Sequence, residues 1–269
     1  MLTKIITVIC FTCSAAIAQD WMALFDGLVS TDSAVSESAR QQLFELLPVL
    51  AAKSDEALNA DIVRLLPVAE DVRETVRSQV SGLLVGLALN RANGLASLKA
   101  AIPLLIRWMQ DSNQNVRMNA HLILANIRPS PPVEAIDAFA ASLSSKEIRA
   151  AGSAAVALGR LSPTTPRATH LLTTSLATER VPERLVAIIY GIGEAKSVEP
   201  SLIEGVTGNL KHVDARVVFA ALDCLGKLGP AASSAAPEIR KLAAQSATVG
   251  SLKGEIADAA NAALSRIGK

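Results

Sequence analysis

Apolar and polar positions alternate along the chain with the period of an α-helix, and one such pattern returns several times. Its clearest copy is residues 101–127, AIPLLIRWMQDSNQNVRMNAHLILANI. A proline near the start of a first helix precedes apolar residues at i, i+3 and i+4, and a polar turn opens at Asp111. Val116 and Leu124 then lie on one face of a second helix. The segment predicts two short helices joined by a turn.

Later segments repeat this arrangement with a nearly constant period. Residues 147–163 and 214–230 align without a gap and share an arginine, a central alanine, a Leu-Gly pair and a closing proline. The anchoring apolar residue recurs at intervals of 37, 40, 34, 34, 33 and 39 residues, which is typical of solenoids of helix pairs. The anchors are Leu47, Leu84, Leu124, Leu158, Ile192, Leu225 and Leu264. We expect seven second helices, ending near Leu47, Ala88, Ile127, Leu161, Ala195, Leu228 and Ile267.

Proline placement agrees with these boundaries. One set of prolines follows the predicted second helices and ends them, namely Pro129, Pro163 and Pro230. Another set lies in first turns, where the missing N–H costs little, namely Pro103, Pro200 and Pro237. A single helix pair would leave one apolar face in water, so we expect the pairs to stack and to bury those faces in a continuous core.

These copies resemble HEAT repeats, and the Ala-rich copies with a Leu-Gly pair are similar to the HEAT-like subtype associated with phycobilisome lyases. The resemblance covers essentially the whole chain after residue 18; the third copy matches best and the first two match least. It implies an all-α fold, a right-handed α-solenoid of about seven HEAT-like helix pairs whose second helices line the concave side. We predict a single repeat domain over residues 19–269.

The first 18 residues have the three parts of a signal peptide. Lys4 precedes an apolar stretch from Ile5 to Cys13, and Ala16, Ile17 and Ala18 form a small-residue cleavage site. We expect cleavage after Ala18 and a secreted or periplasmic protein. An uncleaved anchor is the alternative, but the apolar stretch is shorter than the roughly 20 residues that span a bilayer. Residues 80–89, VSGLLVGLAL, are also too short and predict a buried helix, so we expect no integral membrane segment in the mature chain.

Charge and chemistry argue against several classes of function. The chain has 26 basic and 25 acidic residues, and cleavage removes only Lys4, so the mature chain is neutral and a nucleic-acid partner is disfavoured. His121, His170 and His212 lie in different copies without a second ligand at metal-binding spacing. No nucleophile elbow, phosphate loop or dinucleotide motif occurs. We therefore predict no catalytic residue, no metal and no cofactor.

The resemblance also leaves an enzyme as the alternative, a HEAT-like lyase or glycosylase-type protein acting on a bound small molecule or nucleic acid. Cys224, the one cysteine left after cleavage, is either a reactive thiol or a buried structural one. We favour the buried thiol because the equivalent residues of other copies are small or apolar, namely Ile123, Ala157, Gly191 and Ala263.

Arginines recur near the starts of the second helices, at Arg117, Arg149, Arg184 and Arg216. They could recognise an anionic ligand, or they could pair with acidic residues of neighbouring repeats such as Asp111, Glu147 and Asp214. We favour the ion pairs because Glu183 and Glu255 occupy equivalent positions.

A last feature is apolar residues on the side of the second helices that faces away from the predicted core. A face exposed only to water should be polar. We call this set the outward row: Met118, Leu122, Val156, Val186, Tyr190 and Phe219, with Gly152, Gly159, Gly193 and Gly226 beside it. One interpretation is a surface that binds a protein or peptide partner; the other is packing between tightly curved second helices. The sequence predicts a scaffold and leaves these two open.

Overall fold

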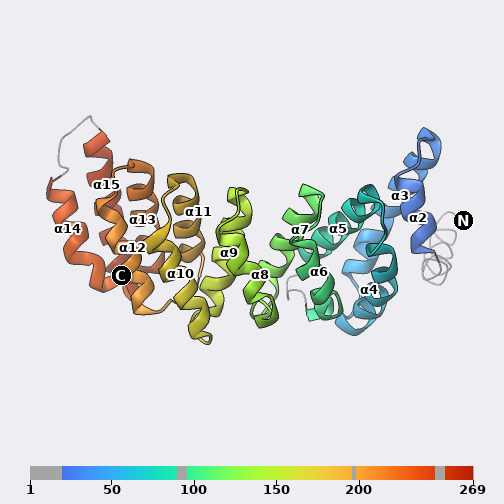
Figure 1. Ribbon diagram of the computed structural model, residues 1–269, viewed down its shortest axis with the longest axis horizontal. Coiled ribbons are helices and arrows are strands. Elements are labelled where there is room, and N and C mark those ends of the chain that lie inside the picture. Colours follow the sequence, from blue (N-terminus) through green and yellow to red (C-terminus); the bar gives the residue numbers. More distant parts are fainter. Residues whose placement is uncertain (1–19, 90–95, 196–197, 246–251, 269) are drawn as a thin grey trace, which may run out of the picture. The chain divides into compact units, whose positions relative to one another are not determined.

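A computed structural model describes residues 20–89, 96–195, 198–245 and 252–268 (Figure 1). Within these ranges the ordered elements are α-helices and short 3-10 helices, and no strand occurs there. The chain divides into two compact units, unit 1 ending at Arg128 and unit 2 beginning at Pro129. The all-α fold of stacked helix pairs is confirmed.

The described residues of unit 1 form three helix pairs. Their second helices pack in series, so that α5 contacts both α3 and α7, and α2 closes the start of the unit against α3, α4 and α5. The elements are α2 (Trp21–Leu28), α3 (Ser33–Ala51), α4 (Asp55–Ala69), α5 (Glu74–Leu89), η1 (Ala96–Ala101), α6 (Ile102–Trp108) and α7 (Gln114–Asn126).

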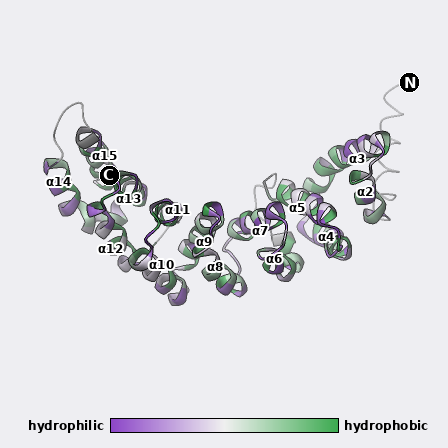
Figure 2. Ribbon diagram, turned by 45° about the horizontal axis from the view of Figure 1, so that its top comes forward, coloured by the Kyte–Doolittle hydropathy of each residue, from purple (hydrophilic) through white to green (hydrophobic). Residues whose placement is uncertain are grey.

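In the part of unit 2 that the structure describes there are four helix pairs. Its second helices, α9, α11, α13 and α15, pack in series and line the inner side of the unit's curve, with the first helices outside them (Figure 2). The elements are η2 (Val133–Ala135), α8 (Ile136–Leu143), α9 (Ile148–Leu161), α10 (Pro166–Thr178), α11 (Pro182–Gly193), α12 (Pro200–Gly208), η3 (Asn209–Lys211), α13 (Ala215–Leu228), η4 (Gly229–Ala235), α14 (Ala236–Gln245) and α15 (Leu252–Ile267).

The predicted ends of the second helices agree with the structure to within two residues in six pairs. The first is wrong, because α3 continues past Pro48 to Ala51. Leu46 and Leu50 are buried on either side of that proline, and their packing holds the helix through a residue that removes one backbone hydrogen bond. The single domain over 19–269 stays a prediction, and the segment 1–18 lies outside the described residues.

Local signals explain most helix starts. Asp20, Asp32, Ser54, Asn113 and Asp214 are N-caps whose side chains accept hydrogen bonds from the first turn. The prolines predicted in first turns lie at the starts of α6, α12 and α14. Among the described residues, no helix has both the length and the apolarity that a bilayer span requires. The stretch 80–89 is the buried half of α5, as predicted, with Val80, Leu84 and Leu87 at most 1% exposed.

Candidate functional site

The turns inside the helix pairs share one hydrogen-bonding pattern. In the six such turns that the structure describes, a side chain accepts a hydrogen bond from the backbone N–H two residues later. This arrangement fixes the turn locally, in the way of an Asx or ST turn. The acceptor and donor residues are Ser30 and Asp32, Asp71 and Arg73, Asp111 and Asn113, Ser145 and Glu147, Glu179 and Val181, and His212 and Asp214.

In unit 1 an arginine six residues later completes the turn. Arg77 donates to the carbonyls of Asp71 and Val72, and Arg117 donates in the same way to the carbonyls of Asp111 and Ser112. Arg77 also reaches the next repeat, with Nε 2.7 Å from one Asp111 carboxylate oxygen and Nη2 3.0 Å from the other. This two-pronged ion pair links α5 to the turn before α7.

The Arg77–Asp111 pair is largely shielded from water. The two side chains are 15% and 8% exposed. Burial works to raise the pKa of Asp111, but the hydrogen bonds from Arg77 and from the Asn113 N–H outweigh it and hold that pKa below its usual value. The pair therefore stays charged at neutral pH and acts as a structural clamp.

In unit 2, Arg184 and Arg216 also link neighbouring repeats. Arg216 pairs with Asp214 of its own turn and crosses to Glu183 on α11, at 2.6 and 2.9 Å. Arg184 pairs with Glu179 and donates to the carbonyl of Ser145 in the preceding repeat. The expectation of inter-repeat ion pairs is thus confirmed for Arg216. For Asp111 the predicted role is confirmed, but the partner is Arg77, which the sequence analysis did not single out.

Glycine and alanine bring the second helices of unit 2 close together. A Cβ added at Gly191 of α11 would lie 2.8 Å from the backbone nitrogen of Val156 and 2.9 Å from the carbonyl oxygen of Gly152, both on α9. Gly193 faces Cys224 on α13 in the same manner, at 3.2 Å from its Cα. These contacts are between backbones, which only small residues allow.

Cys224 is a buried structural thiol, as predicted. It is 0% exposed, and burial raises the pKa of its thiol to about 12. A thiolate is therefore scarce at neutral pH, and the residue is unreactive in the folded chain. The equivalent residues of other repeats are buried as well, namely Ile123, Ala157, Gly191 and Ala263.

The outward row is divided between the units. Met118 and Leu122 lie on α7 of unit 1, one turn apart and half-buried. The other four lie on consecutive second helices of unit 2: Val156 on α9, Val186 and Tyr190 on α11, and Phe219 on α13. Tyr190 is 43% exposed and the other three are half-buried. None of the six belongs to the fully buried core, and their role in binding stays a prediction.

Two lines of charged residues border the unit 2 part of this row. On one side Glu183 pairs with Arg216. On the other, Lys227 lies 2.7 Å from Glu194 and 3.3 Å from Asp223, and its Nζ lies 5.6 Å from the centre of the Tyr190 ring. These opposite charges neutralise one another across repeats. The two lines of charged residues that border the apolar residues therefore carry little net charge.

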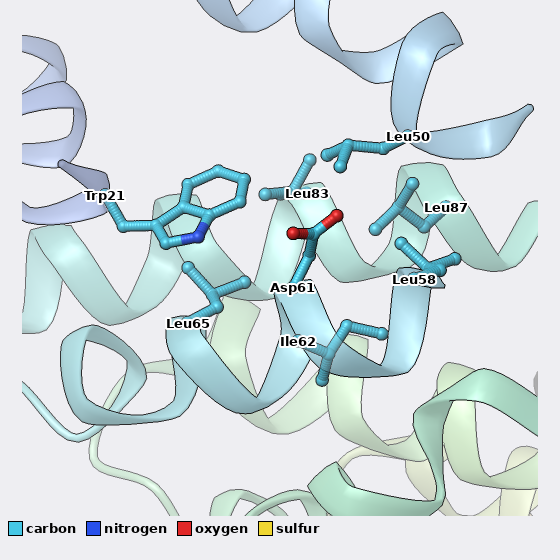
Figure 3. A pocket seen from close by; sticks show the side chains of 8 residues that line it. All are labelled: Trp21, Leu50, Leu58, Asp61, Ile62, Leu65, Leu83 and Leu87. Atoms are coloured by element: carbon cyan, nitrogen blue, oxygen red, sulfur yellow. The ribbon is translucent and has the colours of Figure 1, made fainter. Parts of the chain in front are cut away.

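A second candidate in unit 1 was missed by the sequence analysis. Trp21 and Asp61 meet in a small pocket among α2, α3, α4 and α5 (Figure 3). The Trp21 Nε1 is buried and has no hydrogen-bond partner among the described residues, whereas the Asp61 carboxylate accepts from Lys53 Nζ at 2.5 Å. The other lining residues are Leu50, Leu58, Ile62, Leu65, Leu83 and Leu87. In the sequence, this site could have been recognised from Asp61, an acidic residue on the otherwise apolar face of α4.

The histidines do not form a site. His121 is buried, with Nδ1 2.7 Å from the carbonyl oxygen of Arg117, and His212 takes part in its turn. His170 is exposed on α10. Over the parts of the chain that the structure describes, no three His, Cys, Asp or Glu side chains gather in a way that could hold a metal ion.

Comparison with known proteins agrees with this architecture. A family model for HEAT repeats matches residues 102–193. No curated protein matches the chain in sequence. The chain contains HEAT repeats: the family pattern covers the third to fifth helix pairs, and the other described pairs stack in the same way.

Solved structures extend the similarity over most of the chain. An archaeal HEAT-like repeats protein from Thermococcus onnurineus NA1 is 13% identical with a TM-score of 0.56, covering 90% of this chain and 97% of its own. Yeast importin-β (Kap95p) is 14% identical with a TM-score of 0.53, over 98% of this chain and 39% of its own. A structure of Kap95p binding RanGDP gives 15% and 0.54, over 98% and 38%. At these identities the similarity establishes the fold alone.

Proposed function

We propose that the protein is an exported scaffold that binds a protein or peptide partner on the outward row and performs no chemistry of its own. The observation that carries this proposal is Tyr190. It is a large aromatic residue, 43% exposed, at the middle of a row where water alone would favour polar side chains. Tyrosine is among the residues that dominate binding energy at protein interfaces.

The fold supports the same interpretation. Stacked repeats create extended inner surfaces, and repeat proteins commonly use such surfaces to bind partners. Yeast Kap95p, which has a similar fold, binds the protein RanGDP. Arg77 is paired with Asp111 and Arg184 with Glu179, and the Cys224 thiol is buried. These facts favour a scaffold over a lyase or glycosylase.

Partner capture with matched variants tests the binding surface. The mature chain, Tyr190→Ser and Val181→Ser are each used as bait with the envelope fraction of the native cell. Val181 is a suitable control because it is 39% exposed but lies at the start of α11, away from the row. We expect one stoichiometric protein to be captured by the wild type and by Val181→Ser, and to be lost with Tyr190→Ser. Equal capture by all three would place the partner elsewhere.

The export part of the proposal has its own measurement. Cleavage after Ala18 gives a mature chain that begins at Gln19. N-terminal sequencing of the protein from its native cell should return Gln19, and fractionation should recover it outside the cytoplasm. A cytosolic protein that begins at Met1 would contradict export and leave the binding proposal to the capture experiment.

A further inference from the structure

Arg73 joins the N-terminal helix α2 to the second repeat, and one of its contacts is a methionine. Arg73 lies in the turn between α4 and α5, and its Nη2 is 2.7 Å from Asp26 Oδ1 and 3.8 Å from Met22 Sδ. Met22 and Asp26 are one turn apart on α2 and therefore lie on the same face of that helix. These contacts help to hold α2 against the rest of unit 1.

Hydrogen bonds within the turn fix the position of the Arg73 guanidinium. Nε donates to Asp71 Oδ1 at 2.9 Å, and Nη2 donates to Asp71 Oδ2 at 2.7 Å. The Met22 sulfur is the weakest of the Nη2 partners, because a thioether is a weak acceptor and the other two are carboxylates. Nη1 has no hydrogen bond or ion pair with the described residues. A stronger acceptor on the Met22 side chain would therefore have N–H groups of Arg73 close by.

Met22 is also the most accessible of the methionine side chains that the structure describes. It is 39% exposed, whereas Met109 is 2% exposed and Met118 is half-buried. An oxidant in solution must reach the sulfur atom, so exposure decides which methionine is oxidised to its sulfoxide first. The thiol of Cys224 is buried. A peroxide should therefore act on Met22 before the other described sulfur atoms.

We propose that Met22 is a site of oxidation and that its sulfoxide accepts a hydrogen bond from the Arg73 guanidinium, which tightens the attachment of α2. In the reaction, the Met22 sulfur attacks one oxygen of hydrogen peroxide. The O–O bond breaks as the S–O bond forms, and the second oxygen leaves as water with both hydrogens of the peroxide. The sulfur loses two electrons and the peroxide gains them. Arg73 undergoes no chemical change and binds only the product oxygen.

The expected effect of this oxidation is opposite to the usual one. A sulfoxide in a protein core disrupts packing because it puts a polar oxygen among apolar side chains. Met22 lies outside the core, since the buried residues of α2 are Trp21, Phe25, Gly27 and Leu28. The added oxygen stays at the surface, where a hydrogen bond from a charged donor is stronger than the bond to sulfur. Oxidation should therefore hold α2 more firmly.

Peroxide treatment of the full chain tests the site of oxidation. The folded protein is treated with a low concentration of hydrogen peroxide, and the sulfoxide at each methionine is followed over time by peptide mass spectrometry. We expect Met22 to be oxidised first, at least about tenfold faster than Met109 and also faster than Met118. The same treatment in urea should make the three rates similar. Earlier oxidation of Met109 or Met118 in the folded chain would contradict the assignment.

Hydrogen exchange of the α2 amides tests the effect on the helix. Oxidation of the wild type should slow this exchange by about 1.5-fold to fivefold, the range for an exposed charged contact. Met22→Leu cannot form a sulfoxide, and its exchange should not respond to peroxide. Met22→Gln carries an amide oxygen that is a strong acceptor, so its α2 amides should exchange more slowly than those of Met22→Leu without any peroxide.

Arg73→Leu separates the proposed hydrogen bond from other effects of the oxygen. This variant has no guanidinium to bind the sulfoxide, so oxidation should leave exchange in α2 unchanged or make it faster. Far-UV circular dichroism checks that each variant keeps its helix content. Unchanged or faster exchange in the oxidised wild type, or slowing that persists in Arg73→Leu, would overturn the proposed contact even if Met22 is oxidised first.

Discussion

The two units stack the same kind of helix pair, but their second helices meet in different ways. In unit 2 the backbone of α11 lies directly against that of α9, because a Cβ at Gly191 would lie 2.8 Å from the Val156 nitrogen. In unit 1, a Cβ at Gly82 of α5 would meet nothing within 4 Å, and one at Gly86 would meet only the Leu47 side chain. At these glycines, α11 meets the backbone of α9 in unit 2, whereas α5 meets only a side chain in unit 1.

The ion pairs between neighbouring repeats are better shielded from water in unit 1 than in unit 2. Unit 1 links neighbouring repeats through Arg77 and Asp111, whose side chains are 15% and 8% exposed. The comparable link in unit 2 joins Arg216 to Glu183, at 61% and 51% exposed. Since each repeat contacts only its neighbours, one solenoid can combine different interfaces, provided that each pair of neighbours is held. We therefore expect different substitutions to destabilise the two units.

The largest effect is expected from Asp111→Asn in unit 1. The amide keeps the shape of the side chain and can still accept from the Asn113 N–H, but it leaves the guanidinium of Arg77 without its counter-charge. Breaking a buried pair from one side costs about 3–5 kcal/mol; we expect about 3 kcal/mol here because water reaches one edge of the pair. Urea unfolding followed by circular dichroism measures it.

Glu183→Gln is the matched control in unit 2. It removes the same charge from an exposed pair, and we expect little change in the urea midpoint. If the two variants shift the midpoint equally, the distinction between a buried and an exposed link is wrong.

The second prediction concerns a glycine substitution that should destabilise unit 2 but not unit 1. Gly191→Ala places a methyl group against the backbone of α9, so one helix must move, and overpacking of this kind typically costs about 1–3 kcal/mol. Gly82→Ala makes the same change in open space inside α5 and should stabilise the chain by about 0.5–1 kcal/mol through helix propensity. Thermal melts of the two variants should move in opposite directions. A stabilised Gly191→Ala would show that α9 and α11 are not in backbone contact.

Much of this fold can be predicted from the sequence, because the same helix-pair pattern recurs in each repeat. The period, the anchors from Leu84 to Leu264 and the prolines locate six of the seven second helices. The same alignment explains the burial of Cys224, since its equivalents are small or apolar in every copy compared. A residue that must fit between neighbouring helices has to be small or apolar in each repeat. Comparing the aligned repeats therefore identifies such positions.

The details that sequence reasoning missed depend on contacts between repeats. Nothing in the pattern distinguishes Arg77 from Arg117, yet the structure places Asp111 beside the first as an ion-pair partner. Trp21 and Asp61 are 40 residues apart and meet only because α2 packs on α4 and α5. Helical periodicity predicts which face of a helix is buried, but not which side chain of the neighbouring repeat lies opposite.

The third prediction concerns acid stability and the turns common to both units. Hydrogen bonds from Arg73 and Arg216 lower the pKa of Asp71 and of Asp214 to about 2 each. A carboxyl whose folded pKa lies below its unfolded value, about 3.9, stabilises the fold above pH 4, and the contribution is lost as the pH falls towards 2. The urea midpoint should be flat from pH 7 to 5 and decline below 4. Asp71→Asn should make that decline shallower, and an unchanged profile would contradict the role of the turn.

The smallest effect is expected from Tyr190→Ser, and it tests whether the outward row is surface or core. The ring is 43% exposed, so its removal should change the free energy of unfolding by about 0.5 kcal/mol or less, as for most surface substitutions. Leu225→Ala, at a position 0% exposed on α13, should cost about 2–5 kcal/mol. Phe219→Ser should fall between them because that ring is half-buried. If Tyr190→Ser melts as low as Leu225→Ala, Tyr190 is wedged between second helices, and any loss of binding would reflect unfolding and not a lost contact.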